Sequence, residues 1–317
     1  MPHKYTDEEF AAAWQRAGGS PQTVAEMLGM SIRAVYSRRN RTEERLGITL
    51  TSVPRGNNGM DNSPRTRAYD RQHDFELDTG CIIIFSDAHW WPQQQRTPAH
   101  RALIGLIQRL KPRAVVANGD VFDGARVSRH APMGWVDAPT VRQELDVCLD
   151  NMNEIVMAAP KGCHFQWTVG NHDQRFDRML ATQAGEYAGV VDRLPDRFPE
   201  WEFAWSFAVN NEVMIKHRIA GGIHTGYNNT LKSGWTTVTG HTHTLEVKPW
   251  ADYNGRRWGV QTGTLSDMQA DQFEYAENNP SYSGQGFAVI TYSNGVLLPP
   301  ELCEVIDGIA YFRGEAV

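Results

Sequence analysis

The sequence of 317 residues predicts an α/β domain preceded by a small all-α domain. Residues 1 to about 50 show apolar residues at helical spacing, with capping residues between the segments. From residue 81 onward, short β-branched runs end in polar residues and alternate with helical stretches, which is typical of an α/β sheet. With 41% hydrophobic residues, the chain can bury one core of ordinary size and one small extra domain.

Composition excludes several classes of protein. The formal charge of -6 excludes a generally basic nucleic-acid binder, although a local basic patch is compatible with it. Four widely spaced cysteines without a CxxC pair predict free thiols rather than a disulfide framework. The sequence shows neither the apolar run of a membrane helix nor the apolar stretch of a signal peptide. We therefore expect a cytoplasmic protein that does not bind a membrane.

The first domain, residues 1–50, is predicted to contain three short helices. Thr6 and Glu9 have the spacing of a capping box at the start of the first helix. Ser20 and Pro21 suit the N-cap and the first turn of the second helix, and Gly29 allows the tight turn that ends it.

The third helix carries the charge that suggests a partner for this domain. Ser31 is its predicted N-cap. Its buried face is expected to hold Ile32, Val35 and Tyr36. Its opposite face is expected to hold Ser37 and the candidate DNA-binding residues Arg33, Arg38 and Arg41. Residues 33–45 contain five arginines and two glutamates, and this balance of +3 suits contacts with phosphate groups.

The run QTVAEMLGMSIRAVYSRR resembles a helix-turn-helix DNA-binding unit, with the helix from Ile32 as its recognition helix. The resemblance implies that DNA is a partner of this domain. A three-helix protein-docking module with a solvated basic face is the alternative, because such units are also used without nucleic acid.

The second domain, residues 75–317, follows a predicted flexible linker over residues 51–74. The linker is rich in Gly, Pro, Asn and Ser and has almost no apolar periodicity. In the second domain, five apolar runs each end in residues that ligate metals. These runs are CIIIFSDAHW, AVVANGDVFDG, FQWTVGNHD, EVMIKH and WTTVTGHTH.

The series DxH, GDxxD, GNHD, a strand-terminal His and GHTH resembles the calcineurin-like metallophosphoesterase superfamily, over roughly residues 80–270. The resemblance implies a four-layer αββα sandwich that holds two divalent metal ions. Two such cations can neutralise the charge of a phosphate ester and activate a water between them. Mixed nitrogen and oxygen ligands favour Mn, with Fe, Zn or Mg as alternatives.

The resemblance also implies a role for each metal ligand. Asp120 would bridge the two metals. The first metal site would be completed by Asp87, His89 and His243. The second would be completed by Asn171, His241 and a histidine of the fourth motif.

The fourth motif offers two candidate ligands. His217 ends its strand, as the family motif requires, but Arg218 replaces the usual glycine. His224, in the run GGIHTG, is the alternative. We prefer His217, because strand ends place ligands more reproducibly than loops do.

Four further residues are candidates for catalysis and substrate binding. His172 matches the family position that is close to the substrate without binding metal, which implies that it protonates the leaving oxygen. Asp123 resembles the acidic partner that orients this histidine, with a loop cap as the alternative role. Arg129 and Arg175 could each hold a phosphate oxygen in a fork geometry, or could form surface salt bridges instead.

The sequence therefore predicts two-metal-dependent hydrolysis of phosphate esters. The N-terminal domain favours DNA as substrate, since tethering raises its local concentration at the site. A nuclease that resembles phage-encoded metallophosphoesterases is the preferred function. The alternatives are a small-molecule phosphatase or cyclic-nucleotide phosphodiesterase with a docking domain, and a DNA-binding regulator that has lost activity. No particular oligomeric state is predicted.

Overall fold

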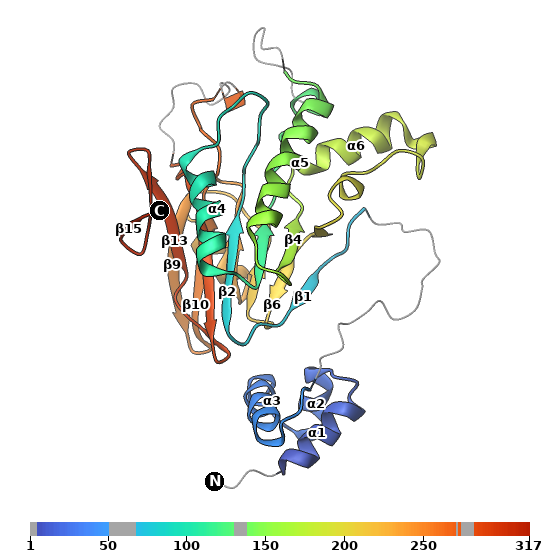
Figure 1. Cartoon of the computed structure of the whole chain (residues 1–317), viewed down its shortest axis with the longest axis vertical. Coiled ribbons are helices and arrows are strands. Elements are labelled where there is room, and N and C mark those ends of the chain that lie inside the picture. The colour runs from blue at the N-terminus through green and yellow to red at the C-terminus, as the bar shows by residue number, and fades with distance from the viewer. Residues whose placement is uncertain (1–4, 51–67, 130–137, 271, 274–281) are drawn as a thin grey trace. The chain divides into compact units, whose positions relative to one another are not determined.

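The computed structural model describes residues 5–50, 68–129, 138–270, 272–273 and 282–317 (Figure 1). The chain divides into two compact units, residues 1–68 with 292–297, and residues 69–291 with 298–317. Residues 69–74, which were expected in the linker, thus belong to the second unit. Tyr69 is buried there, and its hydroxyl donates to Asp177 Oδ2 at 2.6 Å. The rest of the predicted linker, residues 51–67, lies outside the described residues.

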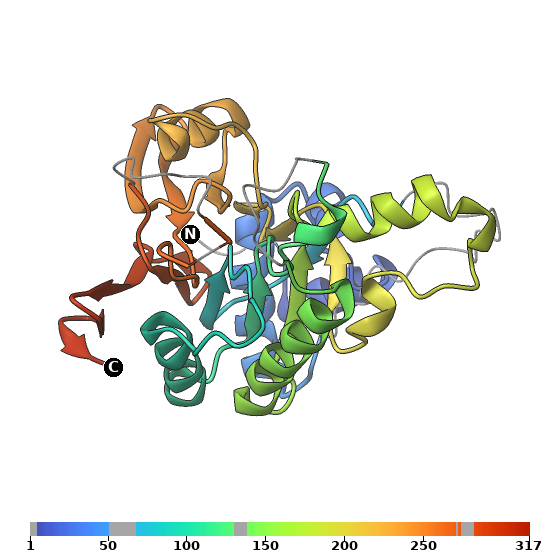
Figure 2. The same ribbon diagram turned by 90° about the horizontal axis from the view of Figure 1, so that it is seen from above.

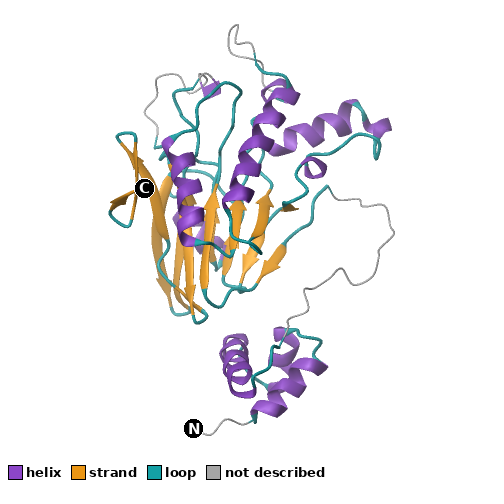
Figure 3. Ribbon diagram, viewed as in Figure 1, coloured by secondary structure: helices purple, strands orange, loops and turns teal. Residues whose placement is uncertain are grey.

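The described part of residues 1–50 contains three helices joined by loops, as predicted (Figure 3). They are α1 (Asp7–Arg16), α2 (Pro21–Leu28) and α3 (Ile32–Leu46). Thr6 and Glu9 form the expected capping box, and Ser20 and Ser31 cap α2 and α3. Gly29 ends α2 at a φ of 62°, a left-handed conformation that glycine adopts without steric cost.

The prediction that Arg38 lies on the polar face of α3 is wrong. Its side chain is only 6% exposed, and its Nη2 atom lies 2.8 Å from Asp7 Oδ1. Nη2 also donates to the carbonyl of Tyr5 at 2.9 Å. The reason is helical periodicity, because Arg38 follows the buried Val35 by three residues and shares its face. Arg38 is therefore unavailable to a DNA phosphate.

The other predicted positions on α3 differ in their exposure. Arg41 is exposed, and its guanidinium donates to the carbonyl and the hydroxyl of Ser37, both at 3.1 Å. Tyr36 is half-buried rather than part of the core. The side chains of Ile32 and Arg33 lie outside the described residues. The core of this unit is built instead on aromatic and aliphatic side chains from all three helices, including Phe10, Trp14, Val24 and Val35.

The second unit is built on two sheets, one of which also includes residues 292–297. The first has the strand order β1 (His73–Phe75), β6 (Phe207–Val209), β7 (Val213–Ile215), β8 (Thr236–Thr239), β10 (Gly255–Thr262) and β9 (Leu245–Asp252). The second has the order β15 (Glu315–Ala316), β14 (Ile309–Phe312), β13 (Glu301–Ile306), β11 (Gly286–Ser293), β2 (Gly80–Phe85), β3 (Ala114–Ala117), β4 (His164–Thr168) and β5 (Glu202–Ala204), and β12 (Val296–Leu297) pairs with β11. Strands β2 to β5 are parallel to one another.

Helices cover the outer faces of both sheets, as the expected αββα sandwich requires (Figure 2). Helices α4 (Pro98–Leu110) and α5 (Val141–Ala158) pack on the β2–β5 side, and α7 (Thr225–Ser233) packs on β8, β9 and β10. A further helix, α6 (Asp173–Gln183), follows β4. The remaining helices are short 3-10 turns at Ala125–Val127, Gly185–Tyr187 and Pro195–Arg197.

The continuous apolar run in β2 follows from burial on both faces. Ile83 and Phe85 belong to the core formed with α4 and α5. Ile82 and Ile84 are equally buried, and strand alternation directs them to the other sheet. The four cysteines are free, as predicted. Within the described ranges, no helix is both long and apolar enough to span a membrane.

Replacing Arg38 with alanine is expected to weaken the helical unit, because Asp7 would lose an ion-pair partner that is buried between α1 and α3. Arg41→Ala removes an exposed arginine of the same helix and is the matched control. Hydrogen–deuterium exchange of peptides from residues 5–50, in the full chain, measures the effect. Exchange should accelerate in Arg38→Ala alone, and equal protection in the two variants would contradict a structural role for Arg38.

Candidate metal centre

The polar ends of five strands meet at one edge of the second unit. Strands β2, β3 and β4 are adjacent and parallel, so their carboxyl ends lie side by side. Strands β7 and β8 are likewise adjacent and parallel in the other sheet. The sheets are hydrogen-bonded to each other at this edge, where His217 Nδ1 donates to the Asn118 carbonyl at 2.7 Å. The motifs singled out in the sequence are therefore brought together.

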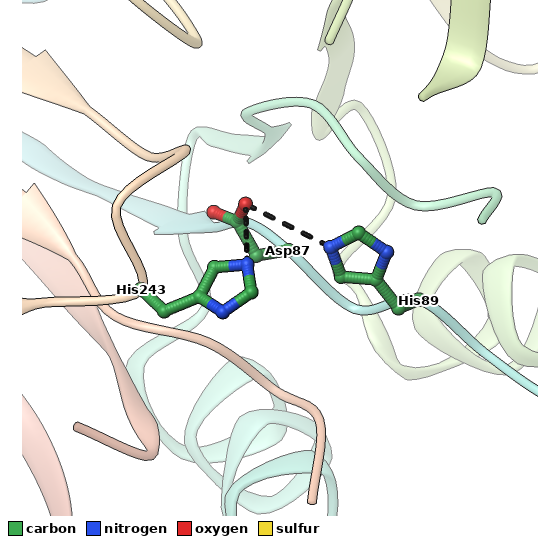
Figure 4. Close-up of side chains that lie close together, drawn as sticks. All are labelled: Asp87, His89 and His243. Carbon is green, nitrogen blue, oxygen red and sulfur yellow. Dashed lines mark ion pairs between the residues drawn. The ribbon is translucent and has the colours of Figure 1, made fainter. Parts of the chain in front are cut away.

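One cluster contains Asp87, His89 and His243 (Figure 4). The Nε2 atom of His243 lies 3.3 Å from Asp87 Oδ1, and that of His89 lies 4.0 Å from the same oxygen. The side chains of Asp87 and His89 are almost fully buried, and that of His243 is 12% exposed. Two imidazole nitrogens thus face one carboxylate oxygen, an arrangement of the kind that binds a divalent cation.

A second cluster contains Asp120, His217 and His241. His217 Nε2 lies 3.0 Å from Asp120 Oδ2, and both side chains are almost fully buried. Burial opposes the charge on His217, but the carboxylates of Asp120 and Asp87 raise its pKa to about 10. His224, the alternative candidate, is exposed at the N-terminal end of α7. The structure therefore places His217 with the other candidate ligands and leaves His224 outside.

The residues at this edge fit divalent cations on two grounds. Buried polar atoms normally have hydrogen-bond partners, yet His89 Nε2 and Asn171 Oδ1 are buried without one. In addition, burial of Asp87 and Asp120 opposes their ionisation, while nearby histidines lower the pKa of both carboxyls. Such buried negative charge requires a positive counter-charge, which metal ions can supply together with bonds to the unpartnered atoms.

Several candidate ligands have an unusual backbone conformation. Positive φ angles occur at Asp87 (51°), His89 (40°), Asp120 (53°), His241 (71°) and His243 (57°). Residues with a side chain adopt this region at a cost of roughly 1–3 kcal/mol each, and such strain gathers at functional sites. The loops after β2, β3 and β8 therefore hold these side chains at an energetic cost, which their surroundings must offset.

Glycines next to the ligands allow the close approach of the loops. A Cβ atom on Gly119 would lie 2.4 Å from His217 Nδ1, and one on Gly240 would lie 2.6 Å from Asp87 Oδ2. On Gly170 it would lie 2.1 Å from Asp120 Oδ1. The glycine in each of the GD, GN and GH pairs is thus required by packing against a ligand of another motif.

Asp173 is a functional residue whose role the sequence analysis missed. It is fully buried at the start of α6 and accepts hydrogen bonds from four backbone N–H groups and the Trp167 indole, at 2.9 to 3.2 Å. The backbone donors are Asp120, Val121, Phe122 and Gly170. Asp173 therefore fixes the loop after β3 against the loop after β4. Its place in the GNHD motif was the only sequence signal.

The run VQTGTLSDM, which follows the GHTH motif, supports the first motif. Thr264 Oγ1 donates to the Asp87 carbonyl at 2.6 Å, and Ser266 Oγ donates to the Ala88 carbonyl at 2.9 Å. These bonds hold the backbone of the loop that carries Asp87 and His89. Hydroxyl groups aimed at a neighbouring backbone leave no recognisable sequence pattern.

Asp123 connects a candidate ligand to the candidate catalytic histidine. Its Oδ1 atom lies 2.9 Å from His89 Nδ1 and 3.0 Å from His172 Nδ1. Burial opposes its ionisation, but hydrogen bonds with these two histidines hold the pKa of Asp123 well below its usual range. Burial likewise disfavours the charged form of His172, yet the bond to Asp123 raises its pKa. Asp123 thus orients both imidazoles through their Nδ1 atoms.

The two candidate substrate-binding arginines lie in different environments. Arg175 Nη2 is 3.2 Å from His172 Nε2, and Arg175 Nη1 donates to the Asp123 carbonyl at 2.8 Å. Arg175 is therefore part of the site. Arg129 is exposed after the turn Ala125–Val127, and the described residues give it no contact with the metal-ligand clusters.

Comparisons with known proteins show which family the chain is similar to. The model of the family described as calcineurin-like phosphoesterase matches residues 82–279. The gene 54 protein of Mycobacterium phage L5 is 26% identical over 262 residues, which cover 72% of this chain and 94% of that protein.

Among solved structures, Chaetomium thermophilum Vps29 matches 75% of this chain and 97% of its own, with 8% identity and a TM-score of 0.41. Pseudomonas putida nuclease MPE matches 73% of this chain and 86% of its own, with 11% identity and a TM-score of 0.34. The family match spans more than half of the sequence and includes the five motifs whose side chains converge. The chain therefore belongs to the calcineurin-like phosphoesterase family and is a metal-dependent phosphoester hydrolase.

Proposed function

We propose that this phosphoesterase hydrolyses phosphodiesters and that its substrate is DNA. The observation that carries the chemistry is the pair of adjacent Asp–His clusters, with buried polar atoms that lack a hydrogen-bond partner. Such a site suits the hydrolysis of an anionic ester, because the charge of the ester must be neutralised before a nucleophile can approach.

The proposed ligand set follows the two clusters. Asp120 would be shared by two metal ions. Asp87, His89 and His243 would complete the first site, and Asn171, His217 and His241 would complete the second. When bound, two divalent cations neutralise phosphate charge and lower the pKa of a water. The mixed nitrogen and oxygen donors favour Mn, with Fe, Zn or Mg as alternatives.

His172 is the proposed proton donor to the leaving oxygen. Its Nδ1 atom is hydrogen-bonded to Asp123, so Nε2 is the nitrogen that remains for a proton transfer. Arg175 contacts this Nε2 atom, and its guanidinium also suits a phosphate oxygen. We therefore expect Arg175 to exchange its contact with His172 for one with the substrate phosphate. Arg129 is exposed six residues after Asp123, outside the metal-ligand clusters. It would therefore contact only a substrate that extends beyond the reacting phosphate.

The three-helix unit supports DNA as the substrate. It contains three capped helices, of which α3 presents the exposed Arg41, and the helix-turn-helix resemblance of its sequence supports the proposal. A unit that binds DNA would raise the concentration of substrate at the tethered site.

One observation favours the second candidate, a small-molecule phosphatase or cyclic-nucleotide phosphodiesterase with a docking domain. Three arginines of α3 are paired within the unit, Arg38 and Arg45 with Asp7, and Arg39 with Glu43. This pairing reduces the positive charge that α3 offers to phosphates.

His172→Ala is expected to retain both metal ions and to lose about a hundred- to ten-thousand-fold in turnover, the usual contribution of a general acid. Turnover of a chromogenic phosphate bis-ester with Mn, together with elemental analysis of the protein, measures both effects. His224→Ala removes an exposed histidine and should behave as the wild type. Loss of bound metal in His172→Ala would assign His172 a ligand role instead.

Arg41→Glu is expected to weaken DNA binding by the full chain and to reduce the slope of affinity against salt by about one unit. Its turnover of a bis-ester should not change. Arg16→Glu, the same charge change at the exposed end of α1, is the matched control. Cleavage of DNA and small esters is measured in parallel. Ester turnover without DNA cleavage or binding would support the second candidate, and DNA binding without any turnover would indicate an inactive regulator.

A further inference from the structure

Glu144 is a buried carboxylate outside all five motifs. It lies in the first turn of α5, where the capping box of Thr140 and Gln143 fixes the start of the helix. Its exposed fraction is 0%, and both of its oxygens accept backbone hydrogen bonds. Oε2 accepts from Gly124 at 3.0 Å, and Oε1 accepts from Ala125 at 3.3 Å.

The turn that Glu144 binds follows Asp123 directly. Gly124 has a φ of 67°, and a Cβ atom there would lie 2.8 Å from Phe122 Cε1 and 3.2 Å from Arg175 Cβ. The turn is therefore packed tightly on one side and hydrogen-bonded to Glu144 on the other. Asp123, at its start, contacts His172 through both its carboxylate and its carbonyl oxygen, each at 3.0 Å.

We propose that Glu144 is a positioning residue, which fixes the Asp123–Gly124 turn and thereby the orientation of His172. Each of the two backbone N–H donors needs its own acceptor oxygen, and the carboxyl group of Glu144 supplies both. This inference rests on the proposed phosphodiesterase function, in which His172 is the proton donor.

The surroundings of Glu144 disfavour its charged form. Burial, followed by the charge of Asp123, raises the pKa of Glu144 to about 8, although the two backbone N–H groups and Arg175 oppose this shift. An unfolded glutamate ionises near pH 4.5, so Glu144 progressively destabilises the folded state as the pH rises from there towards 8.

Glu144→Gln is the direct test, because it keeps the shape of the side chain and replaces one acceptor oxygen with a donor. With Mn and a chromogenic bis-ester, we expect kcat to fall about tenfold or more, while KM and the bound metal are unchanged. In a His172→Ala background the same substitution should change kcat less than twofold, because Glu144 acts through His172. Asp146→Asn, which removes an exposed carboxylate from the same helix, is the matched control.

Unchanged kcat in Glu144→Gln, an equal loss in the His172→Ala background, or loss of metal would overturn the inference. If Glu144→Gln does not fold, Glu144→Asp retains both oxygens on a shorter side chain and should show the same selective loss of kcat. An inactive wild type would contradict the proposed function. Amide exchange of residues 121–128 would then still test the contact, since it should accelerate in Glu144→Gln but not in Asp146→Asn.

Discussion

The burial of two carboxylates, Asp87 and Asp120, is the constraint on which the rest of this structure depends. Both side chains are at most 2% exposed, and each carries a charge that the protein interior alone does not solvate. Histidines surround them. Burial alone would lower the pKa of His217, but the two carboxylates outweigh this effect and raise it to about 10. Protons on histidine and divalent cations are alternative ways to balance the same charge. Divalent cations, unlike protons, would make the cluster a phosphoesterase site.

The fold brings the charged side chains together because strand ends from two sheets meet at one edge. Adjacent parallel strands supply ligands from each sheet, and backbone strain at the ligands is offset by the buried contacts around them. Asp173 joins the loops after β3 and β4, and Thr264 and Ser266 hold the loop after β2. These bonds go to the backbone, so they set the positions of the ligands without occupying the ligand atoms. The site therefore owes its geometry to residues that do not bind metal.

Residue type and spacing explain why much of the site could be predicted from the sequence. Asp87, His89, Asp120, His241 and His243 each follow an apolar run within short motifs, and the structure brings them together. The caps of the three N-terminal helices were predictable for the same reason, because a cap acts within three residues. Local sequence patterns were therefore sufficient to predict the metal-ligand motifs and the helix caps.

Long-range partners explain what the sequence could not predict. Helical spacing from Val35 already places Arg38 on the buried face, but the sequence did not reveal that Asp7, on another helix, pairs with it there. The role of Glu144 depends on backbone amides of a turn far away in the chain, and amides carry no residue-type signal. The choice between His217 and His224 likewise required the placement of two loops, of which only the first enters the cluster.

Metal stoichiometry tests the central claim of a two-metal site most directly. Wild type, His217→Ala and His224→Ala would be equilibrated with Mn, and bound metal per chain would be determined by elemental analysis. Two ions per chain are expected in the wild type and in His224→Ala, and weakened binding of the second ion is expected in His217→Ala. A wild type that binds no more than one ion, or a loss of metal in His224→Ala with none in His217→Ala, would contradict it.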